Sequence, residues 1–216
     1  MTTAPAADHR QIPDAPGFVG KLPSHGDFVS RRLPTALLVP WETWLDAALE
    51  RSREILGEGW LQAYLSAPIW CFSLTPGCCG DCLVAGVMMP SLDRIGRYYP
   101  LTIMAPVRAD RSPTAIALGA TAWFTRMEAL ALSCLADDFD FERFDTSILD
   151  EPFPSSESCE SVLGACGPGA FLALSLSDLI RSSGVAYSVW WTSGSPPGYR
   201  VFRGLPPAEE FAQLLL

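Results

Sequence analysis

Lysine and histidine are nearly absent from this chain of 216 residues. Lys21 is the only lysine, and His9 and His25 are the only histidines. A metal site built on histidines, or a complete Ser-His-Asp hydrolase triad, is hard to assemble from so few side chains. No G-x-S-x-G nucleophile motif occurs either. We therefore expect no metal and no cofactor.

Basic charge is also scarce. The chain has 24 acidic residues against 15 basic ones, a formal net charge of −9, and its basic residues are scattered apart from the pair Arg31 and Arg32. An acidic surface repels a phosphate backbone, so we expect no nucleic-acid partner.

Long apolar runs are missing as well. The longest uncharged stretch, residues 59–80, is interrupted by Pro68 and Pro76, which argues against a membrane span. The first ten residues contain no apolar segment, so we expect no signal peptide and a soluble, cytoplasmic protein.

The seven cysteines form no convincing site. An odd number without a secretion signal indicates reduced thiols, most of them in the core. The segment "CCGDC" at 78–82 contains one C-x-x-C pair, where zinc usually needs two pairs or added histidines.

The acidic run beginning at Asp138 resembles a calcium loop but has Arg143 and Leu149 where glycine and glutamate are required. A solvated acidic surface over 137–151 is the better interpretation.

Apolar periodicity predicts the fold. Residues 1–15 read as a flexible leader and 16–216 as a single domain. We expect an α+β (mixed α/β) fold, in which α-helices cover both faces of an antiparallel-dominated mixed β-sheet. The predicted strands are 17–22, 67–75, 82–89, 100–107, 169–176, 186–193 and 199–204. The predicted helices are 40–56 with Pro40 as first residue, a long one opened by Ser112 and Pro113, and a short one from Pro207.

The polar stretch "GFVGKLPSHGDFVSRRLP" at 17–34 has three possible functions. A phosphate-binding loop is excluded because two residues, not four, separate Gly17 from Gly20. His25 beside Asp27 could act as a general base. Alternatively, Ser24 and Asp27 stabilise a turn by bonding to their own backbone. A structural or partner-binding turn is the favoured interpretation.

A second polar stretch, "MPSLDRIGRYYP" at 89–100, links two predicted strands. Ser91 can cap a short helical turn, and Asp93 can pair with Arg97 four residues later. Arg94 would then point outward or toward the first stretch. The segment is either an ion-paired connection or an arginine-bearing contact surface.

Two adjacent tryptophans, Trp190 and Trp191, lie in a predicted strand. Neighbouring residues of a strand face opposite sides, so one of them should be in the core. The other either packs under a helix or is exposed as a binding anchor.

These segments together resemble the TagF family, also called ImpM, of type VI secretion-associated proteins. The resemblance lies in "GFVGKLPSHGDFVSRRLP", "WETWL…YLSAPIWCFSL", "GVMMPSLDRIGRYYPLTI", "SVWWTSGS" and "GLP…F", and it runs from about residue 16 to the C-terminus. It implies a cytoplasmic accessory protein of a Gram-negative type VI secretion system. It further implies a post-translational repressor that engages the forkhead-associated scaffold protein Fha. It supplies no catalytic residues, requires no histidine at position 25, and does not include the cysteine run.

Two hypotheses follow. The first is a non-enzymatic regulatory binding module, in which Lys21, Asp27, Asp93 and Arg97 lie close together in space. The alternative is a hydrolase or phosphate-handling enzyme that uses His25, Asp27 and an arginine in a pocket. The oligomeric state is not predicted. The residues expected to form a partner-contact or structural polar cluster are Lys21, Ser24, Asp27, Ser91, Asp93, Arg94, Arg97 and Trp190.

Overall fold

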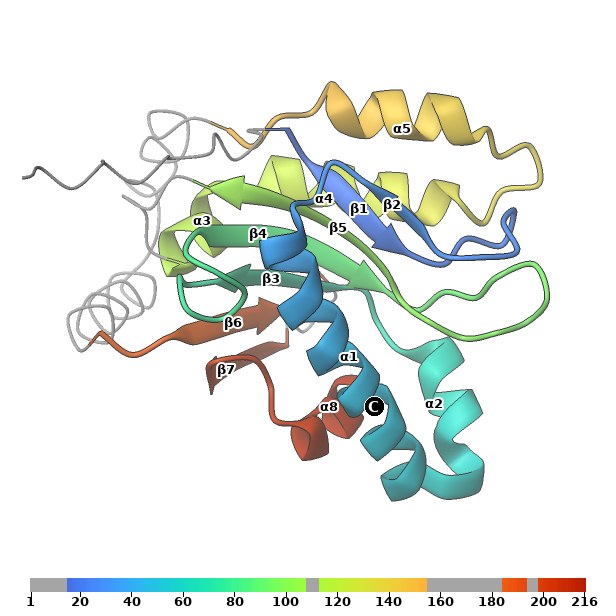
Figure 1. Ribbon diagram of the computed structural model, residues 1–216, viewed down its shortest axis with the longest axis horizontal. Helices are drawn as coiled ribbons and strands as arrows, with labels where there is room; N and C mark the ends of the chain where they lie inside the picture. Colours follow the sequence, from blue (N-terminus) through green and yellow to red (C-terminus); the bar gives the residue numbers. More distant parts are fainter. Residues whose placement is uncertain (1–14, 108–112, 155–183, 194–197) are drawn as a thin grey trace, which may run out of the picture.

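An antiparallel β-sheet forms the centre of the computed structural model, which describes residues 15–107, 113–154, 184–193 and 198–216 (Figure 1). Within these residues every strand pairing is antiparallel, and the strand order is β2-β1-β5-β4-β3-β6-β7. The strands are β1 (Gly17–Gly20), β2 (Val29–Arg31), β3 (Trp70–Leu74), β4 (Leu83–Met89), β5 (Leu101–Val107), β6 (Tyr187–Trp191) and β7 (Tyr199–Arg203).

Helices cover both faces of this sheet (Figure 1). One face carries α1 (Thr35–Leu56), α2 (Trp60–Ser66) and α8 (Ala208–Leu214), with the 3-10 turn Gly57–Gly59 between α1 and α2. The other face carries α3 (Pro113–Gly119), α4 (Thr121–Ser133) and α5 (Phe141–Leu149). None of the described helices has the length and hydrophobicity needed to cross a membrane. The expected α+β class, with helices on both faces, is confirmed.

Alternate residues of each central strand enter two separate cores. Phe72 and Trp190 point toward α1, whereas their neighbours Cys71 and Trp191 point toward α4. Because both faces are buried, these strands read as continuous apolar runs and not as an apolar–polar alternation. The α1 core is aromatic: Trp41 stacks on Phe72 at 4.9 Å between ring centroids and lies 6.2 Å from Trp190. Each such pair contributes about 0.5–1.5 kcal/mol beyond burial.

The strands predicted at 17–22, 67–75, 82–89, 100–107, 186–193 and 199–204, and the terminal helix after Pro207, are confirmed with small changes of boundary. The leader and the strand predicted at 169–176 lie outside the described residues, apart from Ala15.

The predicted start of the first long helix at Pro40 is wrong. Helix α1 begins at Thr35, after Pro34 in an extended conformation (φ −70°, ψ 146°), and Pro40 lies inside it. A proline within a helix removes one backbone hydrogen bond. Leu37 and Trp41, on either side of it, are buried in the core, and this packing holds the turn in helical form.

The helix predicted from Pro113 to about Cys134 is broken in two. Ala120 (φ −108°, ψ 26°) separates α3 from α4, although Ile116, Trp123, Met127 and Cys134 all face one core. The acidic segment that follows is not wholly solvated, because α5 buries Phe144 and Ile148. The side chain of Asp140 caps α5 by accepting a hydrogen bond from the backbone N–H of Arg143 at 2.8 Å.

Candidate functional site

The sheet brings the two polar stretches together. Strand β1 pairs with β5 through Val19 and Thr102, so the loop after β1 lies beside the β4–β5 connection. The approach is so close that a Cβ atom on Gly20 would lie 2.2 Å from the carbonyl oxygen of Pro100, and Gly20 has φ +138°. Only glycine fits both the contact and this backbone conformation.

Asp93 is the centre of the site. Its Oδ2 lies 3.0 Å from Lys21 Nζ and 2.6 Å from Arg97 Nε, and its side chain is fully buried. Its Oδ1 accepts hydrogen bonds from the backbone N–H groups of Ile95, at 3.1 Å, and Arg97, at 2.9 Å. Both carboxylate oxygens are therefore satisfied by positively polarised donors, as a buried charge requires.

These contacts keep Asp93 ionised. Burial by itself raises the pKa of a carboxyl group, but here the Arg97 backbone N–H, the Lys21 ammonium, the Arg97 guanidinium and the Ile95 backbone N–H outweigh it. They hold the pKa of Asp93 well below its usual range. We call Lys21, Asp93 and Arg97 the ion cluster.

The β4–β5 connection is a tight β-turn, so the helical turn predicted there with Ser91 as its cap is wrong. Asp93 N–H donates to the carbonyl oxygen of Arg97 at 3.1 Å, and Leu92 and Tyr98 form an isolated β-bridge. Gly96 takes φ +86° in the turn. The predicted Asp93–Arg97 pairing is present, but across this turn.

Ser91 joins the two stretches instead of capping a helix. Its hydroxyl donates to the carbonyl oxygen of Lys21 at 2.7 Å. The buried Tyr64 of α2 holds the backbone of Ser91 from the other side: its hydroxyl donates to Ser91 O at 2.8 Å and accepts from Ser91 N–H at 3.0 Å. Burial raises the pKa of Tyr64 well above its usual range, so this donor stays protonated. No local sequence signal points to Tyr64.

Two further bonds connect the stretches at the surface. Arg97 Nη2 donates to the carbonyl oxygen of Gly26 at 2.6 Å, and Arg94 N–H donates to that of His25 at 2.8 Å. Arg94 Nη2 lies 3.5 Å from where a Cβ of Gly26 would be, so its guanidinium lies over the first loop. Arg94 thus points toward the first stretch, one of the two orientations expected for it.

An exposed surface lies above the ion cluster. It consists of Asp27, Phe28, Arg94, Ile95 and Arg97, all exposed, and we call it the two-loop surface. Phe28 is 51% exposed and Ile95 67% exposed. Single exposed apolar side chains are common on protein surfaces, but these two lie in the two polar loops that the ion cluster joins. Ile95 could have been noticed in the sequence as an isoleucine inside an otherwise polar turn.

The ion cluster supports Phe28 from below. Lys21 Nζ lies 5.0 Å from the centroid of the Phe28 ring, which also contacts Tyr99 edge to face at 4.7 Å. Asp27 takes no part in the salt bridges of the described residues; its Oδ1 accepts from the backbone N–H of Phe28 at 2.8 Å. Three of the four residues expected to lie together therefore form the ion cluster, and Asp27 faces outward beside it.

His25 is not bonded to Asp27, the carboxylate expected to orient it as a general base. Its Nδ1 lies 2.9 Å from the hydroxyl of Ser24, and its ring packs against Phe141 of α5 at 4.6 Å between centroids. Asp27 is engaged with the backbone of Phe28. The hydrolase alternative receives no support from this arrangement.

Trp190 does not belong to the site. It is fully buried among Trp41, Trp44 and Phe72, and its indole N–H donates to Ser188 Oγ at 3.0 Å. Its neighbour Trp191 is also buried, so the possibility of an exposed tryptophan anchor is wrong. The sequence could not show this because α1 and α4 cover opposite faces of β6.

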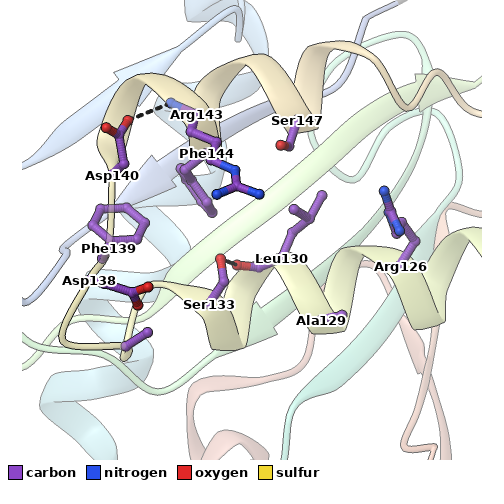
Figure 2. Close-up of a pocket in the computed structure, with 11 residues that line it drawn as sticks. Arg126, Ala129, Leu130, Ser133, Asp138, Phe139, Asp140, Arg143, Phe144 and Ser147 are labelled. Atoms are coloured by element: carbon purple, nitrogen blue, oxygen red, sulfur yellow. Dashed lines mark hydrogen bonds between the residues drawn. The ribbon is translucent and has the colours of Figure 1, made fainter.

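Figure 2 shows a cavity of about 350 Å³ between α4 and α5. The guanidinium groups of Arg126 and Arg143 reach into the space between the helices, while Asp138 and Asp140 lie at the end nearer the α4–α5 loop. The two arginines are offset by these aspartates, so the cavity favours no ligand of one charge. The complete lining is Arg126, Ala129, Leu130, Ser133, Ala136, Asp138, Phe139, Asp140, Arg143, Phe144 and Ser147.

The thiols of the described residues are free. Cys71, Cys79 and Cys134 are buried, whereas Cys78 and Cys82 are half-buried. Burial, together with the nearby Cys78 and Cys82, raises the pKa of Cys79 to about 12. Such a thiol is a weak nucleophile and a weak metal ligand at neutral pH. In the described part of the chain no group of three or more Cys, His, Asp or Glu side chains is placed to hold a metal ion.

Comparison with known proteins shows one matching family and one similar solved structure. The family model for the TagF N-terminal domain, described as type VI secretion system-associated, matches residues 17–150. The crystal structure of PA0076 from Pseudomonas aeruginosa PAO1 is similar to the chain with a TM-score of 0.78 and 35% sequence identity. The similarity covers 93% of this chain and 94% of that one. No curated protein sequence matches the chain.

Proposed function

Because the chain belongs to the TagF family of type VI secretion system-associated proteins, we propose that it is a non-enzymatic, post-translational repressor of that system. It acts in the cytoplasm by binding a component of the secretion machinery, the forkhead-associated scaffold Fha. Involvement in type VI secretion follows from the family. The repressor role, the scaffold and the cytoplasmic location are the proposed refinement.

The observation that carries this proposal is the two-loop surface, which the ion cluster holds in place. Lys21 and Arg97 both bind the carboxylate of Asp93, and these salt bridges hold the two loops in one geometry before any partner binds. A surface that is rigid before binding loses less conformational entropy on association. Aromatic and arginine side chains such as Phe28 and Arg94 are also the types that dominate binding energy at interfaces.

The same arrangement supports a function without catalysis. A general base needs a free acceptor within reach of a substrate proton, and a nucleophile needs an activating base. Asp93 is buried and fully hydrogen-bonded, and His25, although its Nδ1 contacts the Ser24 hydroxyl, forms no salt bridge with a carboxylate of the described residues that could orient it. We therefore assign binding, and not turnover, to this face.

Co-purification with the Fha scaffold tests the proposal. We expect Phe28→Ala and Arg94→Ala each to weaken scaffold binding at least about tenfold, since truncating a hot-spot residue costs about 2 kcal/mol or more. The matched controls are Leu65→Ala on α2, where the leucine is 55% exposed, and Arg126→Ala on α4, where the arginine is also exposed. Both controls should bind as wild type does.

Secretion in cells provides the second readout. Deleting the gene should raise type VI secretion, and complementation with the Phe28→Ala, Arg94→Ala double variant should fail to restore repression. Scaffold binding unchanged by both substitutions, in protein that unfolds at the wild-type temperature, would refute the assigned surface. Secretion that stays at the same level after deletion would refute the repressor role.

A further inference from the structure

Strand β7 forms one edge of the sheet and is exposed. Within the described residues it pairs only with β6, which leaves its other side without a strand partner. Tyr199 is 54% and Val201 58% exposed, and the two arginines of the strand, Arg200 and Arg203, are exposed as well. An exposed edge with apolar side chains is a template for pairing with another chain.

The hydrogen bonds to β6 show which backbone groups of β7 face outward. Thr192 N–H donates to Gly198 O at 3.0 Å, and Gly204 N–H donates to Ala186 O at 2.8 Å. In an antiparallel pair, hydrogen-bonded and non-hydrogen-bonded residues alternate. Because Gly198 and Gly204 bond to β6, the even-numbered residues between them do so too. The N–H and C=O groups of Tyr199, Val201 and Arg203 therefore point away from the sheet.

A hydrogen bond made by the Arg200 side chain agrees with an edge that no other strand of the described residues covers. Its Nη1 donates to the carbonyl oxygen of Tyr199 at 3.0 Å, which is one of the outward-facing groups. This local contact satisfies an acceptor that a neighbouring strand would otherwise occupy.

The opposite edge of the sheet is protected in a way that β7 is not. Strand β2 is only three residues long, and Arg31 and Arg32 at its end are held by Asp145 of α5 in salt bridges. Arg200 and Arg203 form no salt bridge with the described residues. The edge strand β2 is thus shorter than β7, and the arginines at its end are in salt bridges, whereas those of β7 form none with the described residues.

From this edge we infer that the protein self-associates through β7, which pairs antiparallel with β7 of a second copy about a two-fold axis at Val201. In this register every outward-facing backbone N–H and C=O of the strand finds a partner. Tyr199 lies opposite Arg203 of the partner subunit, and Arg200 opposite Phe202 of the partner subunit. The strand sequence Tyr-Arg-Val-Phe-Arg is therefore self-complementary: each guanidinium meets an aromatic ring and not a second guanidinium.

The consequence is a continuous sheet through both subunits with the two-loop surfaces at its far ends. Strands β1 and β2, next to that surface, lie at the other side of the sheet from β7. Both surfaces would remain free to bind, so the dimer would be bivalent toward a partner. A five-residue strand pair buries less than the roughly 1,200–2,000 Å² of a stable interface, so the association should be weak and concentration-dependent.

Sedimentation of the full chain over a wide concentration range tests the dimer. Val201→Pro removes one outward N–H and leaves the hydrogen bonds to β6 intact, so it should abolish the dimer while the subunit stays folded by circular dichroism. Val201→Thr keeps both the N–H and the branched side chain and should sediment as wild type does. A wild-type chain that stays monomeric at every concentration, or a dimer that Val201→Pro does not weaken, would overturn the inference.

Charge changes at Tyr199 test the register. Tyr199→Glu places a carboxylate opposite Arg203 of the partner subunit and should tighten the dimer. Tyr199→Arg places like charges together and should loosen it. Equal effects of the two substitutions would show that this register is wrong.

Cross-linking provides a direct distance test of the two-fold axis. Opposed residues of a hydrogen-bonded antiparallel pair have Cα atoms about 5.5 Å apart, within disulfide range. Val201→Cys should therefore form a covalent dimer under mild oxidation. Tyr199→Cys should not, because in this register residue 199 of one subunit lies several positions along the strand from residue 199 of the other. Cross-linking of Val201→Cys no faster than that of wild type would contradict the axis.

Discussion

Replacing Lys21 with methionine tests whether the ion cluster holds the two loops together. Removing one partner of a buried ion pair costs about 3–5 kcal/mol when the other charge is left uncompensated. Here Arg97 Nε and two backbone N–H groups remain on Asp93, so the loss is closer to one charged hydrogen bond, about 1.5–3 kcal/mol. Methionine keeps the unbranched stem that lies beneath Phe28.

The assay is urea unfolding followed by tryptophan fluorescence, extrapolated to water. We expect a loss of about 2 kcal/mol in the free energy of unfolding, equivalent to roughly 4–8 °C in the unfolding temperature of a chain of this length. The control is Arg126→Met, which breaks the exposed pair with Glu151 at 3.0 Å and should cost about 0–1 kcal/mol. Equal losses in the two variants would refute a special role for the cluster.

The pH dependence separates charge from packing. The pKa of Asp93 is lowered in the folded protein, so its contribution to stability is present above the unfolded value of about 3.9 and is lost as the pH falls through the folded value. Lys21 is one of the groups that lower this pKa. The difference in unfolding free energy between wild type and Lys21→Met should therefore be full above about pH 4 and should shrink as Asp93 is protonated below it. A difference that stays constant down to the lowest pH would show that the loss comes from packing and not from the charge.

Three further outcomes are expected. Gly20→Ala should cost at least about 2 kcal/mol in chemical denaturation, because its Cβ meets backbone at a positive φ, whereas Gly59→Ala, with no atom within 4 Å, should change stability by less than about 0.5 kcal/mol. Trp190→Ala should lose about 3–5 kcal/mol of stability but leave scaffold affinity unchanged at temperatures where the variant is folded; a selective loss of binding would contradict its core position. Burial raises the pKa of Cys134 to about 12, as it does for Cys79, so both thiols should resist alkylation at pH 8 until urea is added, and fast labelling of the native protein would contradict their burial.

The sequence by itself determined the two polar stretches, the two long apolar helical segments and every strand of the described residues except the short β2, because these depend on local patterns of apolar and turn-forming residues. Runs such as 67–75 and 82–89, separated by a glycine-rich turn, predict a hairpin without any knowledge of distant contacts, and β3 and β4 form it. The likeness of the polar stretches to one family was also visible, because their motifs are long and irregular.

Tertiary structure decided what each polar side chain does. Lys21 and Asp93 are far apart in the chain and meet only because β1 pairs with β5. The hydroxyl of Tyr64 reaches Ser91 only because α2 folds back beside the β4–β5 connection. Whether Trp190 is core or surface depends on the helix that covers its face of the sheet. Burial and long-range pairing are properties of the packed layers, so local patterns could place these residues in loops and strands but could not assign their partners.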